Sequence, residues 1–170
     1  MSGKHKARPK SDWLNQLIEM AKESVRKGGR ASPMFFMRHM DHAAAISLDG
    51  LNDKDLWSGL MRFLVTGTKP EEYAFIGESW IKMFDPKKEG EKTLGTLVAM
   101  GVKQVHEFED KAECIMILYG SKETGERGAI IRFERKKEGV EFSEIEWLPT
   151  GIEGRLSNLW NPFGGESKVN

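Results

Sequence analysis

The sequence has little cysteine, no long apolar run and no excess of charge of either sign. Its single cysteine, Cys114, cannot form a disulfide framework within the chain, and the apolar run 112–118 around it predicts a core residue. No stretch approaches the roughly 20 apolar residues of a membrane span. The 26 basic side chains balance the 26 acidic ones, which argues against a whole-protein field that would gather nucleic acid.

Several signatures of catalysis and ligand binding are also missing. The segment GSKETGERG, residues 120–128, lacks the lysine and serine or threonine that end a phosphate-binding loop, and it is better explained as a hairpin turn. No serine stands in a nucleophile elbow. His39, Asp41 and His42 fall in a predicted β-turn with no third strong ligand nearby, so we expect neither a metal site nor a cofactor.

The length and composition of the chain fit one domain. A chain of 170 residues, 39% hydrophobic and 31% charged, buries roughly two thirds or more of the surface that its unfolded form exposes. We divide it into a basic tail (1–10), a single domain (11–150) and a C-terminal segment that contains apolar residues (151–170). The tail, MSGKHKARPK, lacks the apolar core of a secretory signal, so we expect a cytoplasmic protein.

Hydrophobic periodicity and turn residues predict the elements of this domain. We expect a helix capped by Ser11 and stopped by Gly28, and a second helix capped by Asn52 and ending near Gly67. The expected strands are 34–39 and 43–48, joined by a turn, then 73–84, and a meander of 112–120, 128–136 and 140–147. Residues 92–102 fit a helix, although Gly95 and Gly101 weaken it.

This order of elements predicts the fold class. We expect an α+β domain with a mostly antiparallel sheet of about six strands and with two or three helices packed on one face.

The strand YAFIGESWIKMF, residues 73–84, carries a carboxylate at its centre. Alternation places Glu78 and Trp80 on one face, and both faces of the strand are largely apolar, as expected for a central strand. A buried carboxylate must be paired, because burial of a lone charge costs several kcal/mol or more. The candidate partners for Glu78 are Arg38, His39, Arg132 and Lys82.

Three charged residues suggest an alternative function, a metal-dependent nuclease of the PD-(D/E)xK type. Glu113 opens one strand of the meander, and Glu134 with Lys136 supplies the ExK pattern on the next. Such a site needs carboxylates on neighbouring strands to hold Mg²⁺ and a lysine to activate the attacking water. The pattern is short, however, and the proline of the first motif is missing.

The order of PMFFMRH, a helix, YAFIGESW and the glutamate-opened strand in DKAECIMILYG resembles a group of bacterial and phage-borne α+β proteins. The resemblance covers residues 33–135 and rests on Tyr73, Glu78, Trp80 and Glu113. It implies an architecture, an origin on a phage or other mobile element, and a joint role for Glu78 and Trp80. It implies no activity.

The C-terminal segment carries four apolar side chains that need cover, either on the parent domain or on a partner: Leu156, Leu159, Trp160 and Phe163. We therefore expect a non-enzymatic accessory protein that binds another protein or associates with itself as a homodimer. Glu78, Trp80 and these four residues are the predicted contact residues.

Overall fold

A computed structural model describes residues 10–81, 87, 88, 90, 91, 100 and 107–148. The basic tail except Lys10, the C-terminal segment and most of the helix expected at 92–102 lie outside the described residues.

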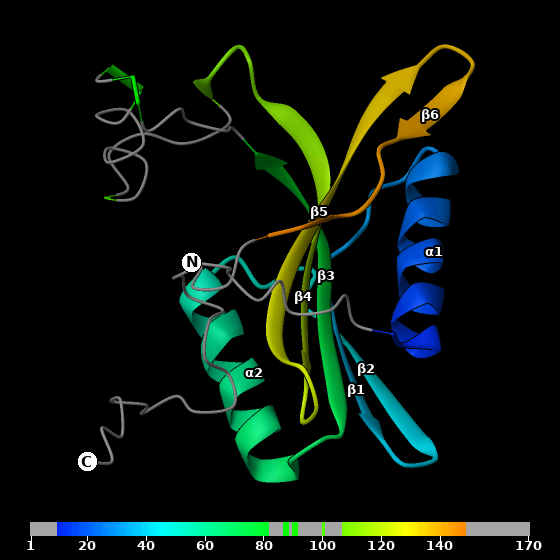
Figure 1. Cartoon of the computed structure of the whole chain (residues 1–170), viewed down its shortest axis with the longest axis vertical. Coiled ribbons are helices and arrows are strands. Elements are labelled where there is room, and N and C mark those ends of the chain that lie inside the picture. Colours follow the sequence, from blue (N-terminus) through cyan, green and yellow to red (C-terminus); the bar gives the residue numbers. More distant parts are fainter. Residues whose placement is uncertain (1–9, 82–86, 89, 92–99, 101–106, 149–170) are drawn as a thin grey trace, which may run out of the picture.

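The described part of the chain contains two helices and one seven-stranded sheet (Figure 1). Every strand pairing is antiparallel, and the order is β2-β1-β3-β4-β5-β6, with β7 also paired to β5. The expected α+β class is therefore confirmed. The elements are α1 (Asp12–Arg26), β1 (Met34–His39), β2 (His42–Ser47), α2 (Lys54–Thr68), β3 (Glu72–Ile81), β4 (Ala112–Ser121), β5 (Gly125–Lys136), β6 (Gly139–Phe142) and β7 (Glu146–Trp147).

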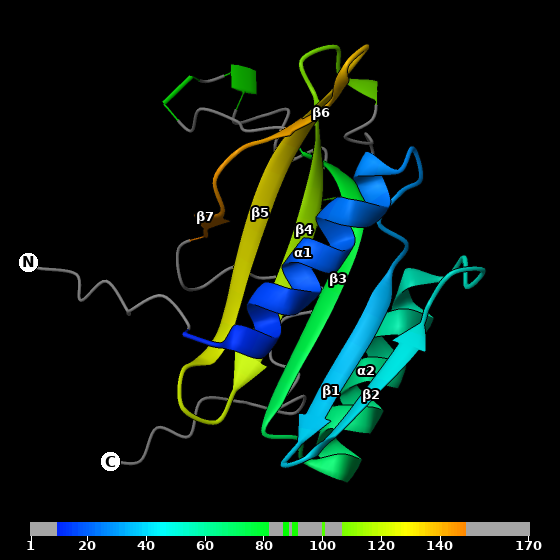
Figure 2. The ribbon, with the colours of Figure 1, turned by 90° about the vertical axis from the view of Figure 1, so that its right-hand side faces the viewer.

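The two helices cover opposite faces of the sheet, not a single face as expected (Figures 1 and 2). On β3, Ala74 and Ile76 point to the core beneath α1, while Tyr73 and Phe75 point to the core beneath α2. Successive side chains of a strand point to opposite faces. Apolar residues at odd and at even positions of β3 therefore lie on different faces, and each face needs a helix to cover it. The α1 core contains Leu14, Leu17, Ile18, Val25, Ile115, Ile117, Ile131 and Phe133, and the α2 core contains Phe35, Met37, Leu48, Met61 and Val65.

The last expected strand, 140–147, is divided into β6 and β7. At Ser143 the ladder with β5 changes: the Ser143 N–H donates to the carbonyl of Arg132 at 2.8 Å, and the Arg132 N–H donates to the Ser143 hydroxyl at 3.0 Å. A side-chain oxygen thus replaces a backbone acceptor and interrupts the regular pairing. The expectation of one continuous strand was wrong for this reason.

The caps of the helices follow the sequence closely. Ser11 caps α1, as expected, by accepting a hydrogen bond from the Leu14 N–H at 3.2 Å. For α2 the cap is Asp53, one residue later than expected, because its carboxylate accepts from the N–H groups of Asp55 and Leu56.

Cys114 occupies the core position that its apolar neighbours predict. It is 2% exposed and makes no disulfide. Burial disfavours the thiolate and raises the pKa of the Cys114 thiol to about 11. In the described part of the chain, neither helix has the length and apolar character that crossing a membrane would need.

Candidate binding cleft

The sheet leaves a cleft where β3 runs past the end of β1. The pairing of β1 with β3 stops at Met34 opposite Ile76, whereas β4 accompanies β3 as far as Ile81. At Glu78 the loop before β1 takes the place of the missing strand, because the Glu78 N–H donates to the carbonyl of Ala31 at 2.8 Å. The β3 residues beyond this bond lie at an edge that no described strand covers on the β1 side.

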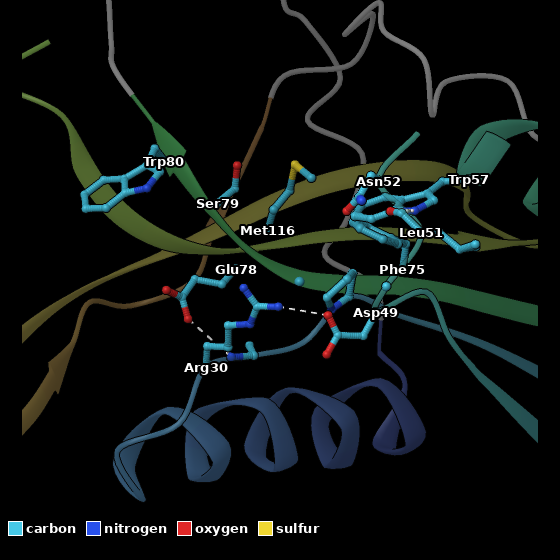
Figure 3. Close-up of a pocket in the computed structure, with 14 residues that line it drawn as sticks. Arg30, Asp49, Leu51, Asn52, Trp57, Phe75, Glu78, Ser79, Trp80 and Met116 are labelled. Carbon is cyan, nitrogen blue, oxygen red and sulfur yellow. Dashed lines mark hydrogen bonds and ion pairs between the residues drawn. The ribbon is translucent and has the colours of Figure 1, made fainter. Parts of the chain in front are cut away.

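The cleft has a volume of about 370 Å³ and brings together five separate parts of the chain: 30–33, 49–52, Trp57, 75–80 and Met116 (Figure 3). Its apolar side is lined by Trp57 of α2, Phe75 of β3 and Met116 of β4. Glu78 and Trp80 also line it, although their side chains belong to the α1 face. Residues from the α1 face and from the α2 face line the same cavity, because the cleft lies at the edge of β3 that no described strand covers.

The apolar side of the cleft is fixed by contacts around Trp57. The indole Nε1 of Trp57 donates to the carbonyl of Leu51 at 2.7 Å, and its ring centroid lies 6.1 Å from that of Phe75. Buried or half-buried indole N–H groups usually need such a partner. The ring is therefore held in place before any ligand arrives.

The rim of the cleft carries an ion pair. Arg30 Nη2 lies 2.8 Å from Asp49 Oδ1, and the Ser32 hydroxyl donates to the other oxygen of Asp49 at 3.4 Å. The side chains of Arg30 and Asp49 are 64% and 46% exposed, and exposed pairs of this kind contribute little to stability. Both charges face solvent and are accessible to a ligand.

Glu78 is paired, as expected, but its partner is Arg135, which was not among the predicted ones. Arg135 Nη2 lies 3.4 Å from Glu78, and Arg135 Nε lies 3.5 Å from Glu113. The Ala31 N–H also donates to Glu78 at 3.3 Å. The side chain of Glu78 is 21% exposed, so the carboxylate is half-buried and is held on the α1 face between a guanidinium and a backbone N–H.

We expect Glu78→Gln to lower the free energy of unfolding by about 1–2 kcal/mol, because Arg135 would lose one of its two carboxylates. Hydrogen bonds to a charged group contribute roughly 1.5–3 kcal/mol, and partial exposure of this pair reduces that figure. Chemical denaturation measures this difference. Glu134→Gln is the matched control, since the Glu134 side chain is 75% exposed and its change should leave the midpoint unaltered. Equal midpoints for wild type and Glu78→Gln would contradict the structural role.

Trp80 stands at one end of the cleft (Figure 3). It is 43% exposed, and Lys111 Nζ lies 5.1 Å from the centroid of its ring. The cation contacts the ring face, an arrangement that is weakly favourable at exposed sites. Trp80 and Glu78 thus border the same cavity. The joint role that the resemblance implies stays a prediction.

The residues of the nuclease hypothesis do not converge. Glu113 lies on the α1 face, because it shares its side of β4 with Ile115. Glu134 follows Phe133 of the α1 core, so Glu134 and Lys136 lie on the other face. Carboxylates on opposite faces cannot hold one metal ion. Within the described residues, no three His, Cys, Asp or Glu side chains form a group that could bind a metal.

Comparison with protein-family models, with curated proteins and with solved structures finds no match to this chain.

Sequence patterns predicted two residues of the cleft, Glu78 and Trp80, and missed the rest. Arg30, Asp49 and Trp57 lie in segments that look like ordinary loop and helix, and only the sheet topology brings them together. One signal was present in the sequence. Trp57 follows closely after a predicted helix cap, so a large aromatic ring was to be expected near the start of that helix. The four predicted contact residues of the C-terminal segment lie outside the described residues.

Proposed function

We propose that this chain is a non-enzymatic, cytoplasmic accessory protein that binds another protein, and that the cleft beside β3 receives a segment of that partner. The observation that carries the proposal is the cleft itself, a preformed cavity of about 370 Å³ with an apolar side, a charged rim and a half-exposed tryptophan. Concave apolar sites with a few convergent polar groups are typical of binding sites. The buried, unpaired Cys114 fits a reducing compartment.

The chemistry of the cleft favours an extended peptide segment with an apolar side chain. That side chain would fit against Trp57, Phe75 and Met116. The rim offers both signs of charge, since Arg30 and Asp49 can each exchange their mutual contact for one with a ligand. Ion pairs at such a rim influence the specificity and the rate of association more than the affinity.

The backbone at the open edge supports the same ligand. The N–H of Glu78 points toward the β1 side, where it meets Ala31. Residues two apart on a strand direct their N–H and C=O groups to the same side, so Trp80 presents its backbone groups to this edge. A partner segment lying along β3 could bond to them, as in other cases of recognition by an added strand.

Peptides selected from a random displayed library on the wild-type protein test this proposal. We expect Trp80→Ala to weaken their binding by about 30-fold, because truncation of an anchoring tryptophan commonly costs about 2 kcal/mol. Met20→Ala is the control, since Met20 is 61% exposed on α1, away from the cleft. Amide chemical shifts should change at 30–32, 49–52 and 75–80.

Two results would contradict the proposal. One is equal affinity of the selected peptides for wild type and Trp80→Ala. The other is a set of shift changes outside the cleft. The origin on a phage or mobile element, which only the resemblance implies, stays a prediction.

A further inference from the structure

β2 forms an outer edge of the sheet, and its sequence does nothing to protect that edge. Its six residues, HAAAIS, include no lysine, proline or acidic side chain, and they pair with β1 in one unbroken register. All are exposed except Ile46, which is half-buried against the α2 core. Natural proteins usually block an edge with charges, prolines or bulges. Figure 2 shows β2 on the outside of the sheet, with α2 behind it.

The hydrogen bonds of β2 determine which backbone groups face outward. The Leu48 N–H donates inward to the carbonyl of Pro33 at 2.9 Å. Because the direction alternates along an antiparallel strand, Ile46, Ala44 and His42 also point inward, to β1. The outward residues are Ala43, Ala45 and Ser47. On this outward side, β2 has no neighbouring strand among the described residues.

We propose that β2 pairs with β2 of a second copy of this chain, antiparallel and about a two-fold axis at Ala45. In this register Ala45 faces its own twin, and Ala43 faces Ser47 of the second copy. Each outward residue offers one N–H and one C=O, so all six outward groups of each strand find a partner. A two-fold interface uses the same patch on both subunits, and pairing centred on Ala45 places β2 against itself in that way.

The side chains agree with this register. Ala44 lies opposite Ile46 of the second copy, so a small residue faces a large one on the α2 face, and the half-buried Ile46 gains cover. The α1 face brings only Ala45 against Ala45 and Ala43 against Ser47. No charged side chain lies on either strand. The carboxylates nearest the strand are Asp41 before it and Asp49 after it, and this register brings Asp41 of one copy to the level of Asp49 of the other. Asp49 is already paired with Arg30 in its own chain, which offsets this approach of like charges.

Sedimentation over a concentration series measures the association. We expect wild type to reach twice the mass of the 19.3 kDa chain, and Ala45→Pro to stay at the single mass. Proline removes only an outward N–H at this position and is tolerated on an edge strand, so the variant should keep the far-ultraviolet spectrum of wild type. A monomeric wild type at every concentration, or a dimer that survives Ala45→Pro, would overturn the proposal.

Disulfide trapping tests the register and also covers the case in which Ala45→Pro fails to fold. Ala45→Cys should form an intermolecular disulfide on mild oxidation, because facing residues of this type lie about 5.5 Å apart between Cα atoms, within the range that a disulfide bridges. Ser47→Cys is the matched control and should not cross-link, since its twin lies four residues away along the strand. The native Cys114 is buried and should not take part in the cross-link. Cross-linking of both variants to the same extent, or of neither, would refute this pairing.

The dimer and the partner cleft rest on different residues. Trp80→Ala should leave the mass in solution unchanged, and Ala45→Pro should leave the affinity for cleft-selected peptides unchanged. A failure of either proposal is therefore distinguishable from a failure of the other.

Discussion

Gly120→Ala should destabilise the fold by about 3 kcal/mol, because the added methyl group has no room. Gly120 lies opposite Tyr73 on the neighbouring strand, and a Cβ at this position would come closer than 3.0 Å to the ring and hydroxyl of Tyr73. The ring cannot move aside. It is fully buried, it packs against Phe35 with the centroids 6.0 Å apart, and its hydroxyl donates to Glu126 at 2.6 Å.

Chemical denaturation of Gly120→Ala measures the effect. Gly59→Ala is a suitable control, because a Cβ at Gly59 in α2 meets nothing within 4 Å among the described residues. Alanine is better than glycine inside a helix by about 1 kcal/mol, so this second variant should be more stable than wild type. If the two substitutions shift the midpoint in the same direction, the close approach of Gly120 and Tyr73 is not the determining contact.

At alkaline pH we expect the protein to lose stability steeply through its two tyrosines. Burial raises the pKa of Tyr73 far above its usual range, and the nearby Glu126 carboxylate raises it further. Burial also raises the pKa of Tyr119, with the carboxylate of Glu72 as a second cause. Phenols of the unfolded chain release their protons near pH 10, whereas both phenols of the folded chain retain theirs.

The stabilising contribution of each tyrosine is therefore complete below about pH 10 and is lost as the pH rises from there toward the raised pKa of the folded state. In that window each phenol lowers the free energy of unfolding by about 1.4 kcal/mol per pH unit. Urea denaturation at a series of pH values measures it. Tyr73→Phe removes the phenol whose pKa is raised more and should reduce the phenol-dependent loss of stability at alkaline pH. Tyrosinate absorbance that develops near pH 10 while the protein remains folded would contradict this account.

Much of the fold could be predicted from the sequence, because local signals coincide with it. Ser11 and the run of apolar residues after it predict α1, and the turn between His39 and His42 predicts the first hairpin. The placement of the helices could not be predicted in the same way. Alternation in the strand at Tyr73 showed apolar residues on both faces, but it did not say that each face has a helix of its own.

The site depends more strongly on register, which the sequence does not specify on its own. Arg135 was missed as the partner of Glu78 because its position depends on how β4 and β5 align. The same alignment separates Glu113 from Glu134, although both appear as charged residues on adjacent strands in the sequence. The cleft exists because β1 is shorter than the part of β3 beside it, and strand lengths are the least certain part of such a prediction.

β3 supplies side chains to both cores, and this has a consequence for how the molecule opens. The cores under α1 and α2 share β3, and β1 and β4 also carry side chains packed against both. Loss of one core would therefore uncover strands whose other face holds the second core. The two halves should therefore melt in one cooperative transition. The amides of Ala74 to Ile76, at the centre of β3, should exchange with solvent only when the whole domain unfolds.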